Sequence, residues 1–157
     1  MSGELKTQGT CLYALDNSGS PEQVLKISNL TNVDSLGGSA GDIDVTNFDS
    51  TAKEYLVGLL DNGTASFGMN LDPDSESHQF LFDNAGGARF KWAVGCSDGT
   101  APPTITGGDT FVLPSTRTWF TFSASIQEAT RAFSVDDAIR IQGSLRVSGD
   151  ITMTPKA

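Results

Sequence analysis

A strict two-residue alternation near the end of the chain constrains the fold more than any other feature. From Ile139 to Met153 every odd position holds Ile, Gly, Leu, Val or Met, and the even positions between and just beyond them hold Arg, Gln, Ser, Asp or Thr. Side chains alternate between the two faces of an extended strand, so this period predicts one long strand of an antiparallel sheet, with one face on a dry core. The run is longer than the usual strand of about five or six residues. A bend or bulge is therefore expected at Gly143 and Gly149.

Length and charge narrow the class of protein. A chain of 157 residues is long enough for one domain with a sizeable core. Its 19 acidic and 10 basic residues give a formal net charge of -9, which repels phosphate and argues against gripping nucleic acid through its backbone. The same charge suits a passage that DNA must cross without sticking. The first ten residues hold no apolar leader and no apolar run is long enough to span a bilayer, which predicts synthesis in the cytoplasm and no membrane partner.

Shorter alternations predict further strands joined by turns. These strands are expected at residues 11–15, 24–33, 42–46, 65–71, 89–94 and 120–126. Residues 35–41 are rich in glycine and are expected to form no regular element. Residues 96–114 are expected to form a long excursion rich in Gly, Pro and Thr. The chain is thus predicted to be mainly an antiparallel sheet.

The period changes to that of a helix after residue 71. Asp72 is expected to cap a helix that begins at Pro73 and runs to about Asn84. Its apolar stripe, which should lie over the sheet, is formed by His78, Leu81, Phe82 and Ala85. This is predicted to be the one real helix of the chain.

The segment from Phe48 to Gly63 has much apolar surface but no clear period. Its apolar residues include Phe48, Tyr55, Leu56, Val57, Leu59 and Leu60, and Gly58 interrupts them. Such a segment is either a loop folded onto its own core or an arm that docks on another subunit. The residues alone favour neither interpretation.

Residue types that carry out chemistry are scarce. His78 is the single histidine and is more typical of a packed residue than of a catalytic base. Cys11 and Cys96 are expected to be reduced, and with one histidine they cannot assemble a transition-metal site. Asp42 and Asp44 share a strand face as a hydrolase pair could, but in so acidic a chain a solvated face is the simpler interpretation. We expect no enzyme activity, no cofactor and no metal, which favours a structural role.

Three stretches together carry a family resemblance: GTCLYALDNSGSPEQVLKISNLTNVDSL, GDIDVTNFDSTAKEYLVGLLDNGTASFGMNLDPDSESHQ and VDDAIRIQGSLRVSGDITMTP. They resemble the tail tube proteins of long, non-contractile bacteriophage tails, from about Gly9 to Pro155. The most specific pieces are DIDVT, DSTAKEY, GLLDNG and NLDPD. The chain departs from the family at residues 98–114, where its insert is longer and is expected to decorate the tube or adjust an interface.

The resemblance implies a fold and an assembly. The fold is mainly β, an antiparallel β-sandwich or partly open barrel with one flanking α-helix, in a single tail-tube domain over residues 1–157 with a long loop at about 34–62. Six copies would form a ring, and stacked rings would form a hollow tube through which phage DNA passes without specific binding. The implied partners are other copies of the chain, a tape-measure protein, a baseplate initiator and a tail terminator. The implied location is the virion tail, assembled in the host cytoplasm.

In that family the long loop reaches the adjacent ring, which gives the apolar residues of 42–62 a binding surface and favours docking. The expected inter-ring interface consists of Ile43, Val45, Phe48, Tyr55, Leu56, Leu59 and Leu60. The alternative is a carbohydrate-binding or adhesin β-sandwich that uses Trp92 and Trp119, with an acidic surface for calcium. An enzyme built on Asp42 and Asp44 is the third possibility.

Overall fold

The computed structural model describes residues 3–17, 22–106 and 110–157. In these ranges the chain forms one α-helix among strands, in the order β1 (Cys11–Asp16), β2 (Gln23–Lys26), β3 (Leu30–Asp34), β4 (Ser39–Asp44), β5 (Tyr55–Asp61), β6 (Thr64–Asn70), α1 (Glu76–Asp83), β7 (Arg89–Gly95), β8 (Thr104–Thr106), β9 (Thr110–Val112), β10 (Trp119–Ala132) and β11 (Arg140–Thr154). Within the same ranges, no helix is both long and apolar enough to cross a membrane.

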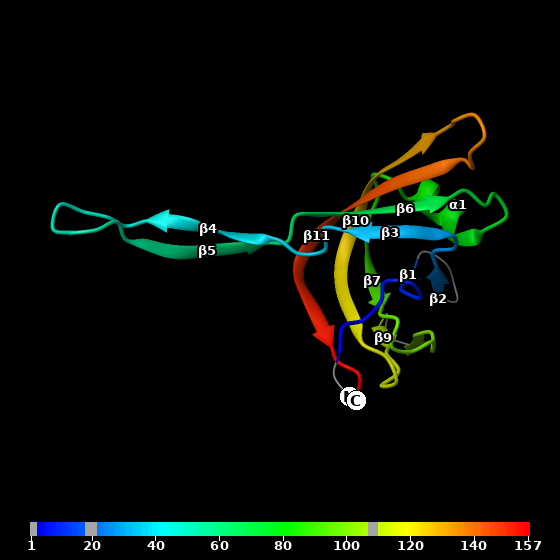
Figure 1. The fold of residues 1–157 in the computed structure, drawn as a ribbon, viewed down its shortest axis with the longest axis horizontal. Coiled ribbons are helices and arrows are strands. Elements are labelled where there is room, and N and C mark those ends of the chain that lie inside the picture. Colours follow the sequence, from blue (N-terminus) through cyan, green and yellow to red (C-terminus); the bar gives the residue numbers. More distant parts are fainter. Residues whose placement is uncertain (1–2, 18–21, 107–109) are drawn as a thin grey trace.

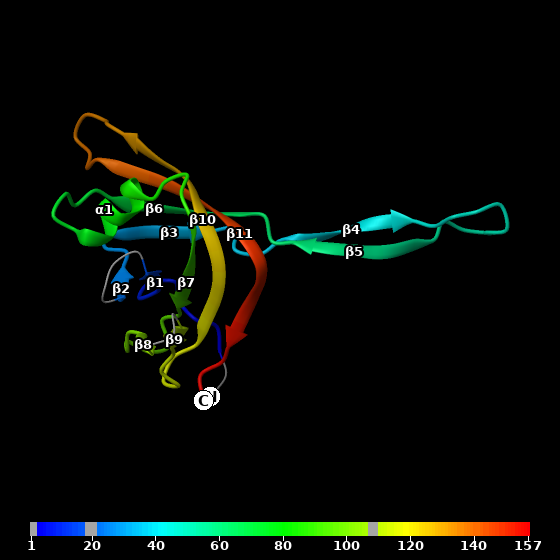
Figure 2. The ribbon, with the colours of Figure 1, turned by 180° about the vertical axis from the view of Figure 1, so that it is seen from behind.

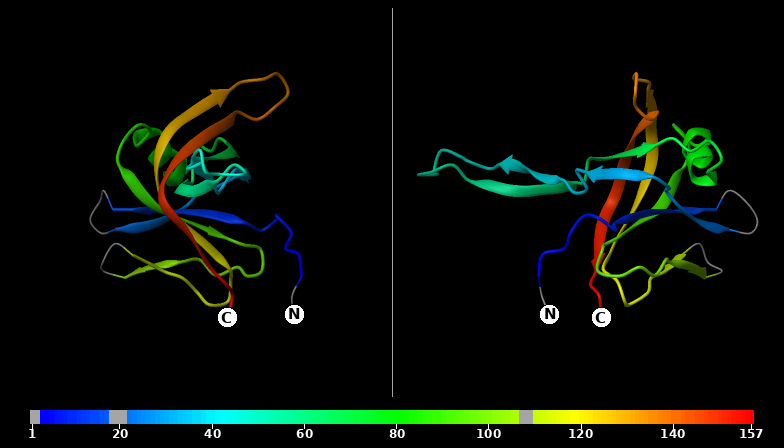
Figure 3. Two further views of the ribbon diagram at one scale, coloured as in Figure 1. Left: turned by 90° about the vertical axis from the view of Figure 1, so that its left-hand side faces the viewer. Right: turned by 45° about the vertical axis from the view of Figure 1, so that its right-hand side comes forward.

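Seven strands form one antiparallel sheet in the order β2-β1-β7-β10-β11-β6-β3. The long strands β10 and β11 run through its centre, and the sheet curls around α1 into a half-barrel (Figures 1 and 2). Seen along another axis, the same two strands twist from one end of the molecule to the other (Figure 3). The predicted fold class is confirmed in its second form, the partly open barrel with one flanking helix.

The main core lies between the helix and one face of this sheet. Trp92 is fully buried there and donates a hydrogen bond from Nε1 to the carbonyl oxygen of Ala124, at 3.1 Å. Phe80 of α1 meets Phe90 of β7 edge to face, with ring centroids 4.9 Å apart. Strand residues at alternate positions fill the rest of this core, as the two-residue period predicts.

A smaller core lies on the opposite face of the sheet. It contains Tyr13, Ala93 and Trp119, and Phe111 and Leu113 pack against it. The excursion at 96–114 therefore does contain regular structure, because β8 and β9 pair within it and its end covers this second core. The sequence did not predict this hairpin, because a short β-hairpin needs few apolar residues when an existing sheet face supplies its packing surface.

Strand β11 confirms the long strand predicted from residue 139 onward. The register between β10 and β11 shifts beside Gly149, whose φ of +84° favours glycine, so the bulge expected there is present. Gly143 instead lies in a regular part of the ladder, and the second register shift is in β10 between Ile126 and Glu128. A Cβ at Gly143 would lie 2.3 Å from Cζ of Phe67, so packing explains this glycine.

Two predicted strand boundaries were wrong. Residues 24–33 form two strands, because Asn29 adopts φ +56° and the chain crosses there from one side of the sheet to the other. Residues 35–41 do contain a regular element, since β4 begins at Ser39, where it pairs with Asp61. Backbone hydrogen bonds to β5 hold this stretch without help from side chains.

The helix was predicted to begin three residues too early. Asp72 forms a turn instead of a cap: its carboxylate Oδ1 accepts the amide N–H of Asp74 at 3.1 Å and its carbonyl accepts that of Ser75. Ser75 is the N-cap residue and the helix begins at Glu76. The buried stripe consists of Ser77, His78, Phe80 and Leu81, so His78 and Leu81 were predicted correctly while Phe82 and Ala85 were not.

Candidate functional site

The residues considered for catalysis have structural roles in this fold. His78 is 1% exposed, and its Nδ1 accepts the backbone N–H of Asp72 at 3.0 Å. Its Nε2 must then carry the proton, which it donates to the carbonyl oxygen of Ser28 at 2.7 Å. A neutral imidazole thus joins the turn before α1 to the turn before β3. In the described ranges, no three His, Cys, Asp or Glu side chains gather as metal ligands would.

The residues on which a hydrolase or a carbohydrate-binding function would depend are not arranged for either function. Asp42 and Asp44 are exposed, and hydrogen bonds from the hydroxyl and amide of Thr46 lower the pKa of Asp44, which is the opposite of what a general acid needs. Trp92 and Trp119 are fully buried, so neither offers a flat surface to a sugar ring. Cys11 and Cys96 are free thiols.

The most unusual surface is a hairpin that we call the arm, residues 39–61. It consists of β4, β5 and a tip at residues 45–54, and it projects away from the half-barrel (Figures 1 and 2). The seven residues predicted as an interface all lie on the arm and are all exposed. Phe48 at the tip and Leu59 near the base are the most exposed, at 109% and 94%. The structure thus brings these residues together on one element.

The strand register assigns the arm's side chains to two faces. Residues opposite each other share a face, and so do alternate residues of one strand. Asp42 and Asp44 lie opposite Val57 and Tyr55, and Leu60 is opposite Ala40 on the same face. Ile43 and Leu56 form a pair on the other face. The arm therefore has apolar residues on both faces. Asp42 and Asp44 lie on one face, and Asp61 lies on the other face at the base.

A projecting two-stranded ribbon of this kind is at best marginally stable by itself in water. The tip is nevertheless ordered by local hydrogen bonds: the amide of Asp49 donates to Oδ1 of Asn47 at 2.9 Å, and that of Glu54 to Oγ1 of Thr46 at 2.8 Å. Phe48, within this tip, is fully exposed. An arm with this much apolar surface and a fixed tip is typical of a segment that packs on another molecule.

Polar contacts fix the base of the arm to β11. A guanidinium nitrogen of Arg146 lies 3.2 Å from both carboxylate oxygens of Asp61, and the amide of Gly63 donates to Oδ1 of Asp61 at 2.9 Å. The side-chain amide of Asn62 donates to the carbonyl of Gly149. The Gly63 amide, followed by the charge of Arg146, lowers the pKa of Asp61. Asp61 is ionised and keeps these bonds above about pH 4, the ordinary pKa of an aspartate. Their contribution to stability is lost as the pH falls through the lowered pKa of the folded state.

We predict that Arg146→Ala frees the arm at its base without unfolding the subunit. The pair is solvent-exposed, so its loss should leave the melting temperature unchanged within error. Hydrogen exchange at Asp61 to Gly63 should become faster, because the carboxylate loses its partner. Arg140→Ala is the matched control, since it removes an exposed ion pair with Asp137 far from the arm. Equal exchange in wild type and Arg146→Ala would contradict the assignment.

The half-barrel has two further surfaces that can join copies. Strand β3 pairs with β6 alone, so its other edge is open in the described part of the chain. Strand β10 pairs with β7 only from Trp119 to Ser125. The backbone N–H of Gly86 donates to the carbonyl oxygen of Ile126, so the free edge of β10 begins at residue 127. Residues 127–132 of β10 thus have no strand on that side among the described residues. The portion β3-β6-β11-β10 is a four-stranded sheet with two open edges.

The outward face of this four-stranded portion is polar. One row crosses it from edge to edge, because the registers place Asp34, Ser66, Ser144 and Glu128 opposite one another in turn. The next row holds Asn32, Gly68, Gln142 and Thr130. The opposite face of the same strands carries Phe67, Leu145 and Ile141 of the main core. One side of this sheet is therefore dry. The other presents hydroxyls, amides and two carboxylates in these rows, with Arg140 and Arg146 on either side of them along β11.

Comparison with known proteins places these surfaces in a family. The family model for the phage tail tube, TTP, lambda-like, matches residues 3–157. The chain belongs to the lambda-like phage tail tube family. A curated relative, Structural protein 3 of Pseudomonas phage PAJU2, is 31% identical over 159 residues, which cover 98% of this chain and 95% of the relative. This tail tube protein is thus a structural component of a virion tail.

Solved structures share the fold of this tail tube protein at low sequence identity. The SPP1 tail tube superposes with a TM-score of 0.64 at 11% identity, covering 97% of this chain and 80% of that one. The tail of an empty GTA particle with C6 symmetry gives a TM-score of 0.61 at 16% identity, covering 96% and 99% of the two chains.

Sequence reasoning missed several residues of these surfaces. Val57 is 78% exposed and shares a face with Tyr55, yet it was left out of the expected interface. Its two-residue spacing from Tyr55 could have identified it. The open edges of β3 and β10 had no sequence signal, because they depend on which strands become neighbours in the sheet.

Proposed function

We propose that this tail tube protein forms hexameric rings that stack into the hollow tube through which phage DNA leaves the virion. The observation that carries the proposal is the combination of two open strand edges on one sheet with an exposed apolar arm. Each subunit thus offers separate surfaces for a neighbour in the same ring and for one in the next ring. The whole chain, residues 1–157, acts as one tail-tube domain in this proposal, and no bond is made or broken.

The ring joint is edge to edge. Three antiparallel pairings separate β3 from β10, so these two edge strands run in opposite directions. Placing β3 of one copy beside β10 of the next therefore continues the antiparallel alternation around a closed ring. The contact is heterologous and closes by rotation. The C6 symmetry of the GTA tail supports six copies.

The arm makes the stacking contact in this proposal. Its exposed residues Ile43, Val45, Phe48, Tyr55, Leu56, Leu59 and Leu60, together with Val57, become buried against the adjacent ring. The insert at 98–114 is less suited to this task, because Phe111 and Leu113 already pack on their own subunit. A baseplate initiator and a tail terminator would cover the arms or arm-binding surfaces of the end rings. A tape-measure protein would occupy the tube during assembly in the host cytoplasm.

The polar face of β3-β6-β11-β10 forms the wall of the lumen. The apolar face of this sheet is covered by the subunit's own core. When the edges join into a ring, the polar face is therefore the one left to line the channel. Asp34 and Glu128 give each copy two carboxylates on this wall. Arg140 and Arg146 share this face, and each forms an ion pair with an aspartate, Asp137 or Asp61. With these cations paired, and with carboxylates and hydroxyls that offer phosphate no attractive contact, DNA can pass without being held.

Electron microscopy of the negatively stained protein tests the proposal. Purified protein, concentrated and offered its initiator complex, should form rings or tubes of uniform diameter. Single particles throughout would contradict it. If clear hits on a glycan array accompanied a monomer by light scattering, the carbohydrate-binding alternative would replace it.

We predict that lysine at both Asp34 and Glu128 makes the lumen hold DNA. Tubes of the double variant should retain short duplex DNA, and the retention should weaken steeply with salt because each new contact releases counterions. Glu76→Lys with Asp83→Lys makes the same charge change on α1 and is the control. Fluorescence anisotropy of labelled DNA measures the retention. Equal DNA binding by the two variants would show that Asp34 and Glu128 do not line the lumen.

A further inference from the structure

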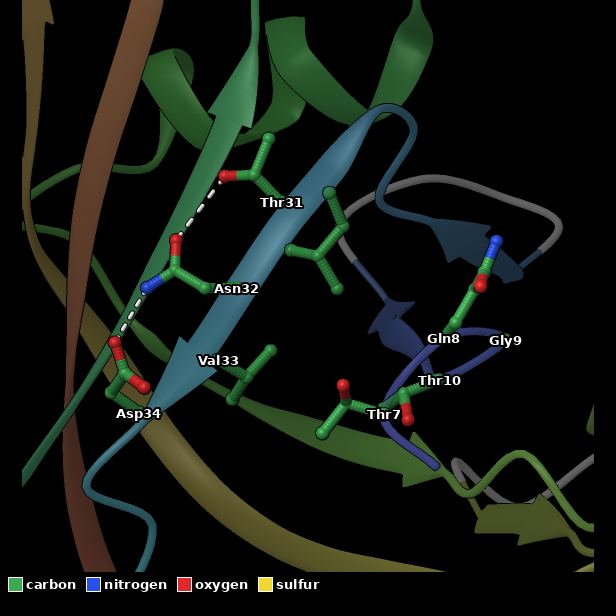
Figure 4. A pocket seen from close by; sticks show the side chains of 9 residues that line it. Thr7, Gln8, Gly9, Thr10, Thr31, Asn32, Val33 and Asp34 are labelled. Atoms are coloured by element: carbon green, nitrogen blue, oxygen red, sulfur yellow. Dashed lines mark hydrogen bonds between the residues drawn. The ribbon is translucent and has the colours of Figure 1, made fainter. Parts of the chain in front are cut away.

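A groove lies along the open edge of β3, and the proposed ring joint would place it at the boundary between two copies. Its volume is about 460 Å³, and its second wall is the turn at Thr7 to Thr10 (Figure 4). Leu30 and Val33 give it an apolar side, while threonine, glutamine and asparagine side chains form most of the rest. Both apolar residues also touch the main core, so the groove has a firm floor.

The hairpin turn after β10 carries two exposed apolar residues that have no role so far. Phe133 is 72% exposed and Val135 is 92% exposed. They follow directly on the open stretch 127–132 of β10 and lie at the tip of the β10–β11 hairpin (Figure 1). A strand that joins an edge of another copy necessarily brings the residues after it to that copy's surface.

The two edges match in length and in polarity. The open stretch of β10 spans residues 127–132, and β3 has five residues. On β10, Ala129 packs on the core, so by alternation Phe133 belongs to the same face. On β3, Leu30 and Val33 lie on the core face as well. Joining the edges therefore places the apolar side chains of β10 beside those of β3 on the core face. On the opposite face, it continues the rows of polar side chains from one copy to the next.

We propose that the groove between β3 and the Thr7–Thr10 turn receives the end of β10 from the neighbouring copy, with Phe133 as its anchor beside Leu30. The occupant is a second copy of this chain, and the inference rests on the proposed ring. It adds the residue that fixes one copy to the next. Phe133 gains the apolar neighbours that it lacks in the isolated subunit.

Matched substitutions test both sides of the contact. Phe133→Ser should raise the protein concentration needed for ring formation at least tenfold, and Phe133→Leu should restore most of the loss. Thr7→Trp fills the groove from the other side and should weaken rings in the same way, whereas Thr7→Ser should not. Sedimentation velocity measures the ring fraction, and circular dichroism checks that each subunit is folded. Rings of normal stability in both Phe133→Ser and Thr7→Trp would overturn the inference.

A cross-link locates the contact directly. With Leu30→Cys and Phe133→Cys in one chain, mild oxidation of assembled rings should give a ladder of disulfide-linked oligomers, while each single variant should not. Wild-type protein that forms no rings would refute the proposed function itself. Wild-type rings without the ladder would refute only this contact. Loss of rings in Thr7→Trp but not in Phe133→Ser would mean that another segment occupies the groove, and would also overturn the inference.

Discussion

Alanine at both Leu56 and Leu59 is expected to abolish tube growth while the subunit stays folded. Leu56 is 57% exposed and Leu59 is 94% exposed, so neither contributes to the core of the isolated chain. If the adjacent ring buries them, each truncation removes about 2 kcal/mol of apolar burial. The double variant then loses about 4 kcal/mol per contact, roughly a thousandfold in the association constant.

The measurement is tube length by negative-stain microscopy, with the melting temperature as the check on folding. Val112→Ala with Met153→Ala is a matched control, because it also removes two exposed apolar side chains but leaves the arm intact. Single rings without tubes would support the separation of ring joint and stacking contact. Tubes of normal length from the Leu56→Ala, Leu59→Ala variant would show that the arm does not form the stacking interface.

The largest loss of subunit stability is expected from Arg117→Ala. Arg117 is 1% exposed, and its guanidinium donates to the carbonyl oxygens of Cys96 at 2.6 Å, Gly9 at 2.9 Å and Gly95 at 3.0 Å. It also lies 5.2 Å from the ring centroid of Trp119. Alanine removes the donor from one buried and two partly buried carbonyl oxygens, at about 1–3 kcal/mol for each that water cannot reach.

We expect a total loss of about 3–5 kcal/mol, which for a chain of this size lowers the melting temperature by roughly 10 °C or more. Calorimetry measures it. Arg131→Ala is the control, because Arg131 lies over the ring of Phe82 at 4.4 Å but is exposed, so only about 1 kcal/mol is at stake. Similar melting temperatures for the two variants would show that the carbonyl cluster does not need its cation.

The parts of the fold that the sequence predicted are those governed by local period. Strand β11, strand β6, which was predicted at 65–71, and the bulge at Gly149 follow from side-chain alternation and from glycine's backbone freedom. The start of α1 was missed because Asp72 and Pro73 suit a turn as well as a helix N-terminus. In the fold, the hydrogen bond from the Asp72 amide to His78 helps to hold the turn, and the sequence gives no sign of this contact.

The sequence also predicted one part of the candidate site and missed another. The exposed residues of the arm were predicted because leucine and phenylalanine without a period are informative by themselves. That the arm is a paired ribbon was not predictable, since Gly58 interrupts the alternation in β5. Arg117 looks like any surface arginine in the sequence, and its five partners come from positions far along the chain.

The two central strands belong to both halves of the curled sheet. Near one end β11 pairs with β6, and near the other end β10 pairs with β7, while β10 and β11 stay paired along most of their length. A ring whose inner diameter changed would have to bend the same strands that support its outer shell. In the proposed ring, each subunit would thus resist dilation as a unit, and the bore would keep a constant diameter while DNA passes.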